Sequence, residues 1–163
     1  GKGKTSSAVG LAVRAAGCKK KVLFARFLKN ENSGELNILD SISDIEVLHL
    51  EKSYGFYKTL TEKEKKEVKK LYEALWNEVL RKVSGGSYDV LVMDEFMAAY
   101  RYGLIPNEEA LCFLEKKPTG LEVVLTGRDP DLRLVEKADY VSEICKVKHP
   151  YDRGIRARRG IEY

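Results

Sequence analysis

The sequence has few cysteines and no long apolar run, and each absence narrows the classes of protein to consider. Its three cysteines, Cys18, Cys112 and Cys145, form no close pair and no spacing typical of metal ligands. That pattern argues against zinc and is typical of buried, reduced thiols in a cytosolic protein. No apolar run approaches the roughly 20 residues of a membrane span, and no signal peptide is visible. We therefore expect a cytoplasmic protein with no membrane partner.

Aromatic residues are scarce in the basic C-terminal segment. Residues 145–163 carry six basic and two acidic side chains, which accounts for the whole net charge of +4. A basic tail of this kind can meet nucleic acid, an anionic cofactor or water. Its aromatic residues are Tyr151 and Tyr163, too few for a platform on which bases stack. We interpret the tail as the last edge of a sheet and a wall of the site, and we expect no nucleic-acid partner.

The first seven residues, Gly-Lys-Gly-Lys-Thr-Ser-Ser, run straight into a helical pattern that reaches Ala16. Glycines let backbone N–H groups close around phosphate oxygens, a lysine adds positive charge, and a threonine hydroxyl can hold Mg²⁺. The helix behind them directs its positive end to the same place. We expect nucleotide binding by Gly1, Lys2, Gly3, Lys4, Thr5 and Ser6.

The complete phosphate-loop pattern, G-x-x-x-x-G-K-[ST], needs a glycine five residues before Gly3, and a strand should lead into the loop. Neither is in the given chain. We therefore expect that the chain lacks its natural start, including the first strand. On these residues alone, a basic, glycine-rich helix start without a ligand is the alternative.

Residues 88–95, Tyr-Asp-Val-Leu-Val-Met-Asp-Glu, predict a strand that is buried on both faces and ends in two carboxylates. Burying acid there is costly unless a cation is near. We expect Thr5, Asp94 and Glu95 to bind Mg²⁺, directly or through water. Two solvated carboxylates at a strand end are the alternative.

The remaining chain alternates between strands and helices. Strands are predicted at 21–28, 45–50, 88–95, 120–126 and 140–147, and helices at 5–16, 35–39, 61–83, 96–102, 107–116 and 131–137. This order predicts one α/β domain over residues 1–163, with a mostly parallel sheet and helices on both faces. Trp76 lies on the apolar stripe of the longest helix and is expected in the core.

Arg128 follows the strand predicted at 120–126, on the edge where open α/β sheets bind ligands. It can contact phosphate or ribose, or form a surface salt bridge. The segment 51–60 contains Tyr54, Phe56 and Tyr57, and such aromatic residues either line a ligand or pack into the core.

Five blocks together resemble the ATP:corrinoid adenosyltransferases, the cob(I)yrinic acid a,c-diamide adenosyltransferase family. The blocks are residues 1–5 (GKGKT), 26–29 (RFLK), 55–56 (GF), 92–95 (VMDE), and a last one from 126 (TGR) to the closing 160–163 (GIEY). The similarity runs nearly end to end, and the closing block is its most specific part. The resemblance implies a RecA-like P-loop NTPase fold, a homodimer, and transfer of the adenosyl group of ATP to Co(I) of a corrinoid, with tripolyphosphate released. This is a step of cobalamin biosynthesis or salvage, for which a flavoprotein can donate the electron.

The resemblance also implies roles for two side chains, Lys4 at the triphosphate and Phe56 at the corrin. Aromatic residues of the family's matching loop fill the lower face of the corrin, so Phe56 is expected to displace the lower axial ligand of cobalt. The family commonly has tryptophan two residues later, where this chain has Lys58. Either Tyr57 takes that part or the lower face is packed differently.

Two other functions share some of these features. A nucleoside kinase of the thymidine-kinase type has the loop, the Asp-Glu strand and a following phenylalanine, here Phe96, but it normally carries a cysteine-rich zinc lasso. The scattered cysteines of this chain cannot build one. A nucleotide-dependent regulator could bind RNA through the arginine-rich end, in a salt-sensitive way.

Overall fold

The computed structural model describes residues 2–28, 34–50, 54–55 and 57–161. They form a four-stranded sheet in the order β2-β1-β3-β4, in which every neighbouring pair is parallel. The strands are β1 (Val22–Arg26), β2 (Ile45–Leu48), β3 (Val90–Asp94) and β4 (Glu122–Leu125). The α-helices are α1 (Lys4–Gly17), α2 (Gly34–Leu39), α3 (Glu62–Ser84), α4 (Phe96–Arg101), α5 (Asn107–Lys116) and α6 (Leu132–Glu136). The 3₁₀ turns are η1 (Tyr57–Thr59) and η2 (Pro150–Arg153). The predicted α/β fold with a parallel sheet is confirmed.

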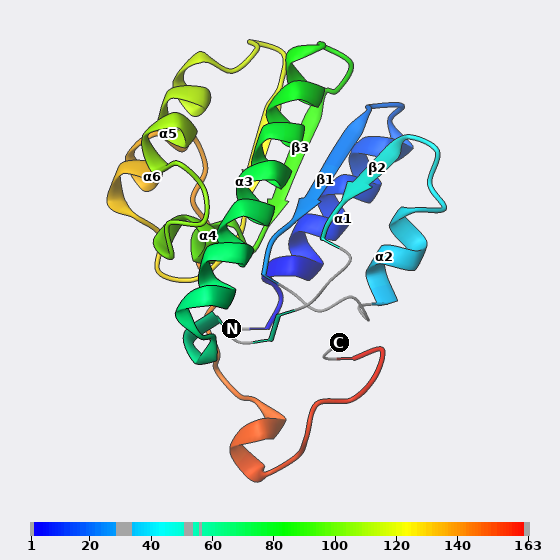
Figure 1. The fold of residues 1–163 in the computed structure, drawn as a ribbon. Helices are drawn as coiled ribbons and strands as arrows, with labels where there is room; N and C mark the ends of the chain where they lie inside the picture. The colour runs from blue at the N-terminus through cyan, green and yellow to red at the C-terminus, as the bar shows by residue number, and fades with distance from the viewer. Residues whose placement is uncertain (1, 29–33, 51–53, 56, 162–163) are drawn as a thin grey trace.

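Helices cover both faces of the sheet, as Figure 1 shows for α1 and α3. Successive side chains of a strand point to opposite faces. Val22 and Phe24 of β1 therefore pack with α1, whereas Leu23 and Ala25 pack with α3, α4 and α5. Both β1 and β3 are buried along their whole length, which explains why their sequences are continuous apolar runs rather than alternating ones.

Helix α1 lies close to the sheet because it presents small side chains. Its buried residues are Ala8, Ala12 and Ala16, each four positions after the last and therefore on one helical face. Helix α3 is longer and buries larger side chains, including Trp76, which is fully buried as predicted. Its start is fixed by the predicted capping box, in which Thr61 N–H donates to Glu64 Oε2 at 2.8 Å.

The strand predicted at 140–147 is wrong. This segment has no regular structure, and the exposed fractions of Tyr140 and Val147 are 94% and 89%. A strand needs a neighbouring strand to pair with its backbone groups, and none of the described strands pairs with this segment. The Ile144 side chain lies beside Gly3, 3.5 Å from where a Cβ atom on Gly3 would be. The chain after it, coloured orange to red, extends away from the sheet (Figure 1). The basic tail is therefore not the last edge of the described sheet.

The expected burial of the cysteines is also wrong. All three are free thiols, with Cys18 and Cys145 exposed and Cys112 partly exposed. Cys18 follows the end of α1 and Cys145 lies in the irregular tail, where no neighbouring layer covers either. Among the described helices, none combines the length and the apolar character needed to cross a membrane.

A hydrogen bond from Tyr88 to Glu46 links the turn before β3 to strand β2. Burial is the larger cause and this hydrogen bond the second, and together they raise the pKa of Tyr88 from its ordinary 10.0 to about 12. Because the folded pKa lies above the unfolded one, this contribution to stability is complete below pH 10 and is lost as the pH rises toward 12.

We expect the free energy of unfolding of Tyr88→Phe to fall less steeply between pH 10 and 12 than that of the wild type. Urea unfolding at several pH values measures this difference. Tyr140→Phe, at a position 94% exposed, is the control and should follow the wild type. Equal slopes for wild type and Tyr88→Phe would show that the Tyr88 hydroxyl is not coupled to folding.

Candidate active site

The glycine-rich turn leads directly into α1, as the sequence predicted. Gly3 precedes the helix with φ of 122°, a backbone conformation that favours glycine. Its carbonyl accepts the N–H of Ser7 at 2.8 Å, and Lys4 is the first helical residue. The first turn of α1 carries no acidic side chain, so the positive end of the helix dipole there is not offset by a carboxylate on that turn. Gly1 lies outside the described residues.

The first turn of α1 meets the acidic end of β3. The Thr5 hydroxyl lies 3.0 Å and 3.1 Å from the two carboxylate oxygens of Asp94. Asp94 is the last residue of β3 and is fully buried. Two segments 89 residues apart in the sequence thus form one site at the carboxyl edge of the sheet.

Thr126, directly after β4, completes the polar cluster around Asp94. Its hydroxyl donates to Asp94 Oδ1 at 2.7 Å and accepts the backbone N–H of Glu95 at 2.9 Å. The sequence analysis did not single out Thr126 as a site residue. The available indication was its place as the last residue of the strand predicted at 120–126, since neighbouring parallel strands end at the same edge.

Glu95 follows Asp94 in a left-handed conformation, with φ of 57° and ψ of 23°. Such a conformation costs energy for a residue other than glycine and is concentrated at functional sites. The backbone bond from Glu95 to Thr126 holds the turn between β3 and α4. Glu95 is half-buried and follows Asp94 directly, so its side chain is the second carboxylate at this end of β3.

The other predicted site residues differ in how far they are buried. Arg128 is exposed, and its predicted contact with phosphate or ribose stays a prediction. Tyr57 is half-buried in η1, and its ring stacks on Tyr102 with centroids 4.6 Å apart. Phe56 lies outside the described residues. Lys2 and Ser6 are exposed beside the loop.

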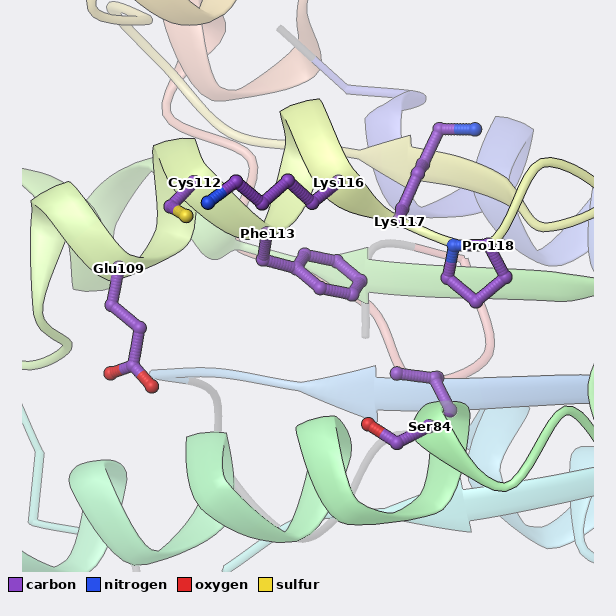
Figure 2. A pocket seen from close by; sticks show the side chains of 8 residues that line it. Ser84, Glu109, Cys112, Phe113, Lys116, Lys117 and Pro118 are labelled. Carbon is purple, nitrogen blue, oxygen red and sulfur yellow. The ribbon is translucent and has the colours of Figure 1, made fainter.

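A cavity of about 420 Å³ lies elsewhere, between α3 and α5 (Figure 2). Ser84, at the end of α3, and Pro118, before β4, place it at the amino edge of the sheet. None of the predicted site residues lines it, and its lining includes Glu109, Lys116 and Lys117. The chemistry-bearing residues of the carboxyl edge therefore do not belong to this cavity.

Comparison with known proteins agrees with the geometry of the carboxyl edge. A sequence model described as ATP:corrinoid adenosyltransferase BtuR/CobO/CobP matches residues 1–163. The chain belongs to this family. It is 33% identical to the corrinoid adenosyltransferase of Escherichia coli strain K12, over 100% of this chain and 81% of that protein. The identity and both coverages are the same for corrinoid adenosyltransferase CobA of Salmonella typhimurium. The chain is 32% identical to the corrinoid adenosyltransferase of Pseudomonas aeruginosa strain PAO1, over 100% of this chain and 79% of that protein. The predicted resemblance is confirmed, and the chain is an enzyme of the adenosyltransferase type.

The oxygen atoms around Asp94 suit Mg²⁺. The Thr5 hydroxyl and the Asp94 carboxylate offer the hard oxygen ligands that this ion prefers. Among the described residues, no group of three or more His, Cys, Asp or Glu side chains could hold a metal ion alone. The donor set thus fits a cation that also takes oxygens from a nucleotide or from water.

The turn after Thr126 depends on a glycine. Gly127 has φ of 151°, and a Cβ atom there would lie 2.4 Å from Cβ of Met97. The close approach lets Met97 N–H donate to the Thr126 carbonyl at 3.2 Å. This contact sets the start of α4 against the end of β4, and it therefore holds Thr126 beside Asp94.

We expect Gly127→Ala to lower the free energy of unfolding by about 3 kcal/mol, the upper end of the cost of overpacking, because backbone strain adds to the clash. Chemical denaturation measures the loss. Gly120→Ala is the matched control: nothing lies within 4 Å of its added Cβ, and its effect should stay below about 0.5 kcal/mol. Similar effects at the two positions would contradict the packing argument.

Proposed function

We propose that this chain transfers the 5′-deoxyadenosyl group of ATP to the Co(I) atom of a corrinoid and releases tripolyphosphate. The observation that carries the proposal is the contact between Thr5 and the buried Asp94, which joins the phosphate-loop helix to an acidic strand end. Membership of the ATP:corrinoid adenosyltransferase family is the reason to propose a corrinoid as the second substrate. ATP is the natural ligand of the loop, because its triphosphate matches both the helix N-terminus and Lys4.

The reaction class follows from the nucleophile. Co(I) attacks C5′ of the ribose, a cobalt–carbon bond forms, and the bond from C5′ to the α-phosphate oxygen breaks with its electron pair on the oxygen. The whole triphosphate then leaves, so no side chain needs to act as a base. The corrinoid carries the difficult chemistry, and the protein supplies orientation and charge.

The residues at the carboxyl edge would stabilise the leaving group. Negative charge grows on the triphosphate as C5′ is attacked, and Lys4 and the positive end of α1 would neutralise it. Thr5 and Asp94 would hold Mg²⁺, with Glu95 acting directly or through water. When bound, this ion neutralises phosphate charge as a Lewis acid. Gly1, Gly3, Lys2 and Ser6 would complete the nucleotide contacts, with Arg128 at the rim.

The corrinoid side of the site is assigned to aromatic residues. Phe56 would pack against the lower face of the corrin and displace the lower axial ligand of cobalt. Tyr57, whose ring stacks on that of Tyr102, is the candidate for the role of the family's tryptophan. Co(I) is then reached more easily from Co(II), with an electron-donating flavoprotein as the expected source.

We include a homodimer and a cytoplasmic location in the proposal. Three free thiols, two of them exposed, suit a reducing compartment and support that location. The corrinoid accepted would be cobalamin, cobinamide or cobyrinic acid diamide.

The phosphate product is the direct test of the proposed reaction. Incubation with ATP, Mg²⁺ and reduced corrinoid should change the corrin spectrum and yield tripolyphosphate. ADP as the product would indicate a kinase, and the absence of any product together with salt-sensitive RNA binding would indicate a regulator.

We expect Lys4→Ala to abolish ATP binding or to reduce turnover at least ~100-fold, the usual effect of removing a group that stabilises developing charge. Adenosylation rate and ATP affinity are measured together. Lys66→Ala, on the exposed face of α3, is the control and should behave as the wild type. Normal adenosylation by Lys4→Ala would remove the loop from the mechanism.

For Phe56→Ala we expect unchanged ATP binding and loss of adenosylation when the corrinoid is supplied as Co(II) with a mild reductant. Chemically prepared Co(I) should still react, because the ligand no longer has to be displaced. Tyr57→Ala, assayed with the same two substrates, tests whether Tyr57 shares this role. Equal loss with Co(II) and Co(I) would show that Phe56 does not govern ligand removal.

A further inference from the structure

Arg26 is a buried cation whose hydrogen-bonding capacity is unused within the described part of the chain. It is the last residue of β1 and only 4% exposed. Its Nε, Nη1 and Nη2 atoms are buried, and no described residue forms a hydrogen bond with them. Its ion-pair partner among the described residues is Glu35 of α2, whose Oε1 atom lies 3.9 Å from Nη2. A guanidinium carries five N–H donors, so a single long ion pair leaves most of them unsatisfied.

Burial of this kind is unfavourable unless something else uses the charge. Desolvation lowers the pKa of Arg26, while the negative charges of Glu35, Asp94 and Glu95 oppose that shift. An arginine stays protonated in a protein all the same. The folded chain therefore keeps a desolvated positive charge at the end of a central strand, and such groups are expected to be paired when the protein works.

The direction of the Arg26 side chain follows from strand alternation. Val22 and Phe24 of β1 pack on the α1 side of the sheet, and Arg26 shares their parity. Asp94 is the register partner of Arg26 on β3, and it faces Thr5 of α1. Arg26 therefore lies on the same face as the phosphate loop, one strand away from Asp94.

The ligand that fits this position is a polyanion. Arginine presents a planar fork that matches phosphate oxygens, and charge-assisted bonds of this type are stronger than neutral ones. Lys4 and the start of α1 already favour negative charge nearby. A guanidinium one strand over would extend the positive surface along a chain of phosphates rather than around a single one.

We propose that Arg26 is a second cationic contact for the triphosphate of the nucleotide, whose oxygens provide the acceptors missing around its side chain. This proposal rests on the proposed function, because it takes ATP as the ligand of the loop. Tripolyphosphate carries more negative charge after it leaves than while it is esterified to C5′. Arg26 therefore favours the transition state as well as the bound substrate.

The test uses inorganic tripolyphosphate as the probe, with no corrinoid present. We expect Arg26→Gln to bind it about tenfold more weakly by titration calorimetry, a loss that corresponds to about 1.4 kcal/mol. The melting temperature of the ligand-free variant is measured alongside, to show that the variant is folded at the temperature of the titration. Arg81→Gln, on the exposed surface of α3, is the matched control.

Glu35→Gln separates ligand binding from a structural ion pair. If Arg26 served only to pair with Glu35, both variants would lower the melting temperature and neither would change tripolyphosphate affinity. That result would overturn the proposal. We expect Glu35→Gln to bind tripolyphosphate at least as tightly as the wild type, since the competing carboxylate is removed.

Arg26→Lys keeps the test decisive if Arg26→Gln does not fold. It retains the charge but loses the fork, so we expect a loss of about threefold in tripolyphosphate affinity, smaller than the loss for glutamine. Unchanged affinity in the folded Arg26 variants, with affinity lost in Lys4→Ala, would overturn the role of Arg26 and leave the proposed function standing. A wild type that neither binds tripolyphosphate nor adenosylates corrinoid would end both proposals.

Discussion

The contact between Thr5 and Asp94 is the interaction on which the rest of the site depends. A carboxylate without exposed surface is costly in a folded protein, and here it is stabilised by two hydroxyls, from Thr5 and Thr126. The three residues come from α1, β3 and the end of β4. Their meeting fixes the first turn of the phosphate-loop helix against two strand ends, so the order of the sheet and the position of the loop cannot vary independently.

The layered fold supplies the geometry for this contact. Small alanines let α1 lie close to β1 and β3, and this brings the helix N-terminus over the carboxyl edge of the sheet. On the other face, large side chains of α3 and α4 fill a thicker layer in which Phe96 contacts Phe27 edge-on at 5.9 Å. Phe96 directly follows Asp94 and Glu95 in the chain. Its packing in the core on the α3 face therefore helps to hold the turn that carries these two carboxylates.

The charged side chains at this edge are of both signs, and a bound nucleotide with its cation would balance both. Asp94 suits a cation, whereas Lys4 and Arg26 suit an anion, and a magnesium-bound triphosphate offers both. The corrinoid would bring its own reactive metal, which explains why an adenosyltransferase needs no acid or base among these residues. The family shared with the Escherichia coli and Salmonella typhimurium proteins is therefore consistent with the polar groups gathered there.

The sequence by itself determined most of the local elements, the parallel sheet, and the places of the glycine turn and Asp94 at a helix start and a strand end, because these depend on periodicity, capping and buried runs. It could not determine what the segment 140–147 pairs with: alternation of apolar residues makes a strand possible, but only a neighbouring strand makes it form. Nor could it reveal that Thr126 holds Asp94, or that Arg26 is buried on the face of the loop. Those features were decided by tertiary structure, because register and strand order bring together residues that are far apart in the chain.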